Sequence, residues 1–278
     1  MPNILITGVT SGIGRATALR FTQEGWDVTG TARPRAFGEE GGPADPGLPA
    51  QMRVKSLDLA SPGSISQLVE EVLAESGAPD VLLNNAGILH FGPLEEAEPE
   101  VIRTVFQVNA FGQIALALGL VPAMRERGSG LIVNVSSLGG RMVFPFFSVY
   151  NASKHALEGF SEGLWHELKP FGIQVKVVRP GYVDTPIYAK AEVDRGAAEH
   201  VSEPYRAAMN KMVDFDARIA KRTRPEDVAD DLWTIVNDSS DRLAYPVAAY
   251  SRFLLTARRV LGESRFVRTA HGRWFGRS

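Results

Sequence analysis

The sequence predicts an α/β fold in which helices cover both faces of a doubly wound parallel sheet. Short runs rich in β-branched residues alternate along the chain with longer stretches of helical periodicity, the order that successive βαβ units require. The strand runs are also apolar throughout rather than alternately apolar and polar, which is typical of strands buried on both faces. These two observations predict the fold class before any functional motif is considered.

Six strands and four long helices follow from this pattern. The predicted strands are 3–7, 26–32, 53–59, 80–85, 130–137 and 173–180. The predicted helices lie near 13–24, 63–76, 99–125 and 150–169.

The chain is predicted to form a single domain over residues 1–278, since it shows neither an internal repeat nor an interdomain linker. Residues 34–50 are rich in glycine and proline and are predicted to form a loop where a helix would be expected. Residues 184–215 carry weak helical periodicity after a turn, and we expect a mobile lid there. Residues 250–278 are expected to add a helical extension.

The composition is that of an ordinary soluble globular protein, with 44% hydrophobic and 22% charged residues and a formal net charge of −2. The absence of cysteine excludes disulfides, cysteine nucleophiles and thiolate zinc sites. The five histidines lack metal-ligand spacing, so no metal site is expected. The N-terminus has no basic region, and the apolar stretch 114–124 is too short to span a bilayer. We therefore expect a cytoplasmic protein.

A glycine-rich segment, TGVTSGIGR, follows the first predicted strand and opens the first predicted helix. Glycines at 8, 12 and 14 allow a tight turn and a close approach to a pyrophosphate, which the helix N-terminus stabilises with free N–H groups. The spacing is G-x-x-x-G-x-G rather than the usual dinucleotide fingerprint. Its position favours a nucleotide site in a Rossmann-type sheet over a merely structural turn.

The residues after the second strand bear on the choice of cofactor. An acidic side chain at this place would accept hydrogen bonds from the ribose hydroxyls of NAD, but the sequence has Ala32 and Arg33. Asp27 lies at the other end of the strand. Because a guanidinium matches a 2′-phosphate, NADP(H) is favoured over NAD(H). The alternative is that Arg33 is simply a solvated loop residue.

Tyr150 and Lys154 stand four residues apart in SVYNASKHALEG, within a predicted helix. Positions i and i+4 share a helix face, so the phenol and the ammonium project side by side. The spacing alone is satisfied just as well by a half-buried tyrosine beside a solvated lysine, which is the commoner arrangement.

Together these motifs resemble, in order and spacing from residue 3 to about residue 185, the compact single-domain branch of the short-chain dehydrogenase/reductase family. The resemblance rests on TGVTSGIG, SLDLAS, NNAG, FQVNAFG, IVNVSS, the Tyr–Lys pair and PGYVDT. It implies a catalytic tetrad of Asn109, Ser137, Tyr150 and Lys154. The cofactor contacts that it implies are Gly8, Ser11, Gly12, Ile13, Gly14, Asp58, Leu59, Asn85, Ala86, Gly87, Tyr150, Lys154, Pro180, Gly181, Val183 and Thr185. Arg33 is added to them by the argument from the end of the second strand.

Ser137 rather than Ser136 is the matching serine, because it lies 13 residues before Tyr150, the usual interval in the family. Ser136 is expected to be structural.

The resemblance implies an NADP(H)-dependent oxidoreductase that interconverts a carbonyl and a secondary alcohol. Tyr150 would be the general acid/base, with its pKa lowered by the Lys154 ammonium beside it. Ser137 would hold the substrate oxygen, Lys154 the nicotinamide ribose, and Asn109 a water that links Lys154 to solvent. No metal is required. The alternative is a catalytically silent dinucleotide-binding regulatory protein, against which the intact tetrad argues.

The loops expected around the nicotinamide are apolar, which favours a small hydrophobic carbonyl or alcohol as substrate. Candidate pocket residues are Met142, Phe144, Phe146, Phe147 and Tyr188, with ordinary packing beneath the lid as the alternative. Members of the family commonly pair the helices that correspond here to 99–125 and 150–169. The resemblance therefore implies a homodimer or homotetramer.

The C-terminal segment mixes arginines with aromatic residues. We expect it to pack helices over the substrate entrance with its arginines in solvent. Contact with a membrane or another anionic surface is a less favoured alternative that the sequence does not exclude. Nucleic-acid binding is not expected, because no recognised module is present.

Overall fold

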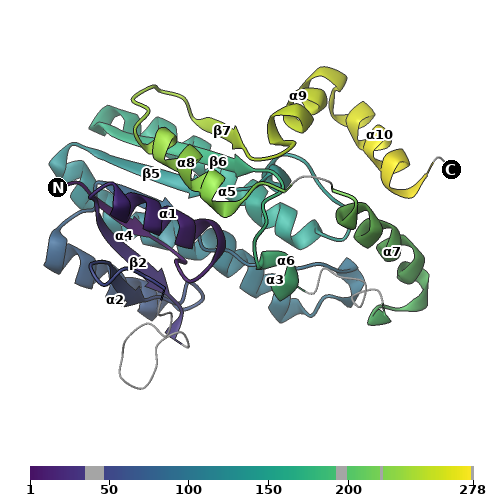
Figure 1. Cartoon of the computed structure of the whole chain (residues 1–278), viewed down its shortest axis with the longest axis horizontal. Helices are drawn as coiled ribbons and strands as arrows, with labels where there is room; N and C mark the ends of the chain where they lie inside the picture. The colour runs from purple at the N-terminus through teal and green to yellow at the C-terminus, as the bar shows by residue number, and fades with distance from the viewer. Residues whose placement is uncertain (35–46, 192–198, 220–221, 277–278) are drawn as a thin grey trace.

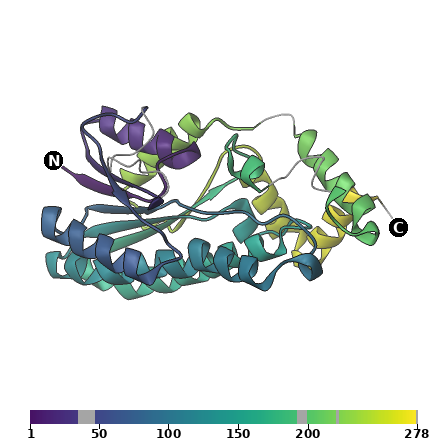
Figure 2. The same cartoon turned by 90° about the horizontal axis from the view of Figure 1, so that it is seen from below.

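The structure, a computed structural model, describes residues 1–34, 47–191, 199–219 and 222–276. Within these residues a sheet of seven parallel strands runs in the order β3-β2-β1-β4-β5-β6-β7 (Figure 1). The side view in Figure 2 shows helices in layers on both faces of the sheet. The predicted α/β, doubly wound parallel fold is therefore confirmed.

Six strands coincide with the predicted ones to within three residues at each end. The strands are β1 (Asn3–Ile6), β2 (Asp27–Ala32), β3 (Arg53–Ser56), β4 (Val81–Asn84), β5 (Gly130–Val135), β6 (Ile173–Pro180) and β7 (Ala244–Val247). The edge strand β7 was not predicted. Its four residues include Pro246, and a proline in so short a run argues against a strand except at an edge.

The helices predicted from periodicity are present, and the C-terminal half adds several more. The helices are α1 (Gly12–Gln23), α2 (Pro62–Ser76), α3 (Pro99–Phe106), α4 (Gly112–Arg127), α5 (Ser148–Leu168), α6 (Ile187–Lys190), α7 (Glu203–Ala217), α8 (Pro225–Val236), α9 (Ser251–Leu261) and α10 (Glu263–Phe275). The predicted helix 99–125 is interrupted by a π-helical turn, η3 (Gln107–Phe111). Helix α8 was missed, although its buried Val228, Leu232 and Ile235 have helical spacing.

Two other predictions fall partly outside the described residues. Of the predicted loop 34–50, residues 35–46 are not described. The predicted lid 184–215 contains α6 and most of α7, with residues 192–198 outside the described part. The mobility of the lid stays a prediction. The C-terminal extension is helical, as expected, and consists of α9 and α10.

Each face of the sheet has its own apolar core. On one face α1 and α8 pack together, with the Phe21 ring 5.1 Å from both Trp26 and Trp233 in edge-to-face geometry. On the other face α2, α4 and α5 supply most of the apolar side chains that pack on the sheet. Because both faces are covered, the central strands are apolar throughout, the pattern that predicted them.

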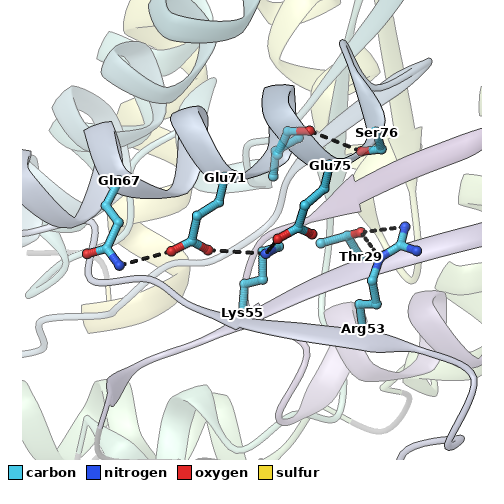
Figure 3. Close-up of polar contacts among 8 residues, drawn as sticks. Thr29, Arg53, Lys55, Gln67, Glu71, Glu75 and Ser76 are labelled. Atoms are coloured by element: carbon cyan, nitrogen blue, oxygen red, sulfur yellow. Dashed lines mark hydrogen bonds and ion pairs between the residues drawn. The ribbon is translucent and has the colours of Figure 1, made fainter.

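The edge strand β3 is fastened to α2 by charged groups rather than by apolar packing. Lys55 donates to Glu71 at 3.1 Å and to Glu75 at 2.7 Å, and these two carboxylates lie one helical turn apart (Figure 3). Arg53, further back on the strand, pairs with Asp27 of β2 at 2.6 Å. Charged side chains of this kind also protect an edge strand from pairing with other chains.

The segment Pro99–Arg127 is the one helical run in the described residues that is long and apolar enough to cross a membrane, with a mean hydropathy of 1.5 over its best window. This run is longer than the stretch 114–124 considered from the sequence. Core helices of soluble proteins pass the same test. Here Leu116, Leu120 and Met124 of α4 pack against the sheet and α2, so we interpret the segment as a core helix.

Candidate active site

A groove of about 410 Å³ runs along the carboxyl ends of the strands, where the strand order reverses between β1 and β4. Ligands of open α/β sheets bind at such a reversal. Most of the residues predicted from the sequence line this groove: Gly8, Ser11, Gly12, Ile13, Arg33, Asp58, Leu59, Asn85, Ala86, Gly87, Ser137, Tyr150, Lys154, Pro180, Gly181, Val183 and Thr185. Gly14 and Asn109 lie behind the lining and support it.

The glycine-rich turn after β1 forms the floor of the groove at the start of α1. Gly8 and Gly12 have φ angles of +77° and +57°, which side chains would strain. A Cβ at Gly14 would lie 2.2 Å from the Gly8 carbonyl oxygen and 2.4 Å from the Asn85 amide. Asn85 also donates to the Thr7 carbonyl at 2.9 Å. The turn therefore stays close to the helix, whose free N–H groups are suited to a pyrophosphate.

The carboxyl ends of β2 and β3 bring Arg33 and Asp58 to the same groove. Arg33 is exposed and follows the last residue of β2. Asp27, at the opposite end of β2, is held in its ion pair with Arg53. Asp58 accepts a hydrogen bond from the Ala60 N–H at 2.9 Å, which fixes the turn after β3. The groove residue at the end of β2 is therefore cationic, as the sequence indicated.

Ser137, just after the end of β5, and Tyr150, in the first turn of α5, lie side by side in the groove. A Cβ at Gly139 would lie 3.4 Å from Ser137 Oγ and 3.3 Å from the Tyr150 ring. Ser137 Oγ accepts the Gly139 N–H at 3.0 Å, which holds the serine in place. Burial raises the pKa of the Tyr150 phenol above its ordinary value of 10, and the neighbouring Ser137 hydroxyl lowers it in part. The phenol is thus a protonated donor at neutral pH. The predicted lowering of this pKa by Lys154 is not observed.

Lys154 lies beneath the tyrosine with its side chain buried. Its Nζ donates to the Val135 carbonyl oxygen at the end of β5, at 2.9 Å, and not to Tyr150. This orientation explains why the lysine does not act on the phenol as predicted. Burial lowers the pKa of Lys154 to about 8, although Glu158 one turn further along α5 opposes the shift. Glu158 is itself paired with Arg179 of β6 at 2.6 Å.

Asn109 is fully buried in the π-helical turn η3. Its amide donates to the Ile88 carbonyl at 2.8 Å and to Ser153 Oγ at 3.0 Å, and its oxygen accepts the Ile88 N–H at 2.8 Å. These bonds join η3, α5 and the loop after β4. A Cβ at Gly87 would lie 3.2 Å from Asn109 Oδ1 and 3.5 Å from Lys154 Nζ. The asparagine therefore adjoins the lysine. It lies in a π-helical turn, a local distortion of a helix that is frequent at functional sites.

Helix α6 closes the groove opposite the sheet, and one of its residues was missed by sequence reasoning. Lys190 donates to Ser11 Oγ at 3.3 Å, a contact between positions 179 residues apart in the sequence. The lysine thus places a cationic side chain beside the glycine-rich turn, in addition to Arg33 at the end of β2. No motif marks this lysine, so only the fold identifies it. Tyr188, on the same helix, lines the groove, and burial raises its pKa, with a smaller contribution from the nearby Tyr150 phenol.

The residues proposed for a substrate pocket fall into two groups, one that lines the groove and one that only packs in the protein interior. Tyr188 lines the groove. Met142 is buried and packs with Phe144 beneath the C-terminal helices, and Phe146 belongs to a separate cluster with Phe91 below α7. For Met142, Phe144 and Phe146 the alternative of ordinary packing is therefore the better description.

The groove fits a nicotinamide dinucleotide along its length. The turn at Gly8 to Gly14 leaves the backbone open for a pyrophosphate, because side chains there would fill the space. Arg33 lies where the adenosine ribose would be held. Tyr150 and Lys154 line another part of the same groove, and Thr185 lies against the glycine-rich turn, where a Cβ at Gly12 would approach its side chain to 3.2 Å.

Comparison with known proteins points to one family. A family model described as short chain dehydrogenase matches residues 2–196. An uncharacterized oxidoreductase of Schizosaccharomyces pombe is 33% identical over 216 residues, covering 78% of this chain and 90% of the relative. A 3-ketodihydrosphingosine reductase of Bacteroides thetaiotaomicron is 39% identical over 182 residues, covering 66% of this chain and 64% of the relative.

Solved structures agree with these relatives. A short-chain dehydrogenase from Streptomyces avermitilis is similar with a TM-score of 0.76 and 34% identity, over 98% of this chain and 95% of the other. A variant of actinorhodin polyketide ketoreductase with NADPH has a TM-score of 0.74 and 31% identity, over 90% and 97%. A 3-ketoacyl-(acyl-carrier-protein) reductase from Brucella melitensis with NADH has a TM-score of 0.71 and 25% identity, over 88% and 96%.

The lowered pKa of Lys154 predicts a pH-dependent contribution to stability. The pKa of about 8 in the folded state lies below the unfolded value of 10.5, so the unfolded chain binds more protons between these limits. The free energy of unfolding should therefore rise with pH from about 8 to 10.5, by at most about 1.4 kcal/mol per pH unit. In Lys154→Met this contribution should be missing.

Urea unfolding at several pH values in this window measures the effect. The free energy of unfolding of the wild type minus that of Lys154→Met should increase as the pH rises. Lys169→Met, which removes an exposed lysine beyond α5, should show no such trend. A constant difference between wild type and Lys154→Met would contradict the assignment.

Proposed function

Because the chain belongs to the short-chain dehydrogenase/reductase family of nicotinamide-dependent oxidoreductases, we propose that it interconverts a carbonyl and a secondary alcohol with Tyr150 as general acid/base. The observation that carries this proposal is the juxtaposition of the Ser137 and Tyr150 side chains in the dinucleotide groove, next to the buried Lys154. A proton donor, an oxygen-binding hydroxyl and a cation thus converge where substrate and cofactor would meet.

Each residue has a defined part in the proposed reaction. The Ser137 hydroxyl binds the substrate oxygen and places it against the Tyr150 phenol. The phenol, which is protonated at neutral pH, gives its proton to the carbonyl oxygen in reduction and takes it back in oxidation. When bound, the cofactor supplies or accepts the hydride. Lys154 holds the nicotinamide ribose, and the adjoining Asn109 binds a water that links Lys154 to solvent.

We propose a hydrophobic substrate. Ile187 and Tyr188 of α6 and Ile88 of the loop after β4 give the groove an apolar side. The Bacteroides thetaiotaomicron relative is named for a ketone, 3-ketodihydrosphingosine, which supports a substrate with a large apolar part.

NADP(H) is the proposed cofactor, because Arg33 lines the groove at the end of β2. A guanidinium pairs well with a 2′-phosphate, whereas NAD binding commonly uses a carboxylate at this place. The related solved structures include both an NADPH and an NADH complex, so the preference is a property to be tested on this chain.

The proposed assembly is a homodimer or homotetramer that uses the face formed by α4 and α5. Phe111 and Leu118 on this face are 55% and 73% exposed, large values for apolar side chains. Burial of these side chains against a second copy would stabilise the pair.

Tyr150→Phe tests the reaction. The variant should keep its fold and bind NADPH, but its turnover of hydrophobic ketones should fall by about 10²–10⁴-fold, because only the proton donor is removed. Tyr245→Phe is the matched control, since it removes a phenol whose hydroxyl bonds to Asp238 outside the groove. Near-normal turnover in Tyr150→Phe would reject the mechanism. Binding without turnover in wild type, across a broad carbonyl and alcohol screen, would favour the silent regulatory protein instead.

Arg33→Ala tests the cofactor. Fluorescence titration of the wild type should show tighter binding of NADPH than of NADH. The variant should lose on the order of ten- to a hundredfold in NADPH affinity, the scale of a charge-assisted hydrogen bond, and keep its NADH affinity. Arg103→Ala, which removes an exposed arginine of α3, serves as the control. Equal affinities for the two cofactors in wild type would overturn the preference.

Sedimentation velocity at micromolar concentration tests the assembly. Wild type should sediment as a dimer or tetramer, and Leu118→Glu should shift it toward monomer because a charge would be buried at the contact. Val260→Glu, an exposed position on α9, which packs on α10 and β7, should leave the assembly unchanged. A monomeric wild type would contradict the proposal.

A further inference from the structure

The C-terminal arm, residues 250–276, packs on the protein through one side only. Helices α9 and α10 turn against each other at Gly262, which has a φ of +73°. Their inner side chains, among them Leu254, Phe266 and Trp274, pack on Leu138 and Met142, in the segment that follows Ser137. Figure 1 shows the arm projecting beyond the sheet beside α7. The arm is thus fixed next to the substrate side of the groove.

The outer side of α9 presents two matched rows of residues. Phe253 and Val260 are seven residues apart and 70% and 77% exposed. Arg252 and Arg259, also seven apart and exposed, precede them in the sequence and project about 100° further round the helix. Residues seven apart share a helix face, so an apolar row and a cationic row run along the same exposed surface.

Charge is distributed very unevenly between the arm and the rest of the chain. Residues 250–278 hold seven arginines, no lysine and one acidic residue, Glu263, and so carry a formal net charge of +6. Subtracting these from the totals of 30 Lys+Arg and 32 Asp+Glu leaves 23 and 31 for residues 1–249, which is −8. Glu263 is paired with Arg258, and Asp231 of α8 lies close enough to Arg252 for the guanidinium to act on its charge. The arm itself supplies no carboxylate to its other exposed arginines.

We propose that the arm is a docking surface for an anionic membrane. An interfacial helix buries apolar side chains among the headgroups while basic side chains at its flank contact anionic lipids, and the two rows of α9 have this arrangement. A second protein copy is less suited, because protein contacts favour apolar side chains at a charge-depleted centre, whereas here each apolar residue adjoins an arginine. Docking would place the substrate side of the groove at the lipid surface.

Vesicle co-sedimentation of the full chain tests the proposal without requiring turnover, so its result is independent of the proposed reaction. The protein should pellet with phosphatidylcholine vesicles that contain about 30 mol% phosphatidylglycerol and not with pure phosphatidylcholine. Raising the salt from about 0.1 M to 0.5 M should release it. No binding to anionic vesicles, or equal binding to neutral ones, would overturn the proposal.

Two arm variants test which residues act. Arg252→Gln/Arg259→Gln should weaken vesicle binding about thirtyfold, since each basic residue near an anionic surface contributes about fivefold. Phe253→Ser/Val260→Ser should weaken binding by at least tenfold, because the apolar area inserted among the headgroups is lost. Both variants should keep their circular dichroism and NADPH affinity, because the outer side of α9 makes no groove contact.

Matched controls remove the same charge and apolar area elsewhere. Arg125→Gln/Lys169→Gln removes two exposed cations at the amino ends of the strands, and Phe171→Ser removes an exposed aromatic residue at the same edge. Neither should change vesicle binding. If the control variants lost as much vesicle binding as the arm variants, binding would not depend on the arm residues, and the proposal would be overturned. An arm variant that changes the sedimentation coefficient without vesicles would assign the surface to a second copy instead.

Discussion

The Lys154 ammonium is buried between α5 and the end of β5, and the catalytic half of the molecule is arranged around its charge. A buried cation is costly unless polar partners surround it, and here the Val135 carbonyl accepts its hydrogen bond at 2.9 Å. Glu158, one turn along α5, offsets the burial, and Arg179 of β6 pairs with Glu158 in turn. This chain of charges sets α5 against β5 and β6, and so fixes where Tyr150 meets Ser137.

The shape of the other half of the groove, around the glycine-rich turn, depends on backbone geometry rather than on charged side chains. Gly14 is needed because the Gly8 carbonyl and the Asn85 amide occupy the space that a side chain would fill. Asn85 directly follows β4, so the same hydrogen bonds hold the glycine-rich turn and the centre of the sheet together. The strand-order reversal between β1 and β4 brings both halves to one edge of the sheet, where a single ligand can contact both.

The lid and the C-terminal arm are built on this frame and differ from it in composition. Helix α6 brings Lys190 across to Ser11, and α7 is joined to α10 through the Lys211 side chain and the Phe215–Trp274 contact. The described part of the arm carries exposed arginines, whereas residues 1–249 are acidic overall. The residues proposed for cofactor choice, substrate access and membrane docking therefore lie on separate elements around the sheet.

The sequence by itself determined the sheet and the groove. Local apolar runs predicted β1 to β6, and short motifs placed Gly8, Ser137, Tyr150 and Lys154, because strand ends and helix faces follow from residues near in the chain. It did not determine β7 or α8, whose signals were short or overlooked, nor the Lys190–Ser11 contact, which joins positions 179 residues apart. It also gave the wrong direction for the pKa of Tyr150. Only the tertiary structure decided that direction, because burial and the orientation of Lys154 toward Val135 depend on how α5 packs against β5.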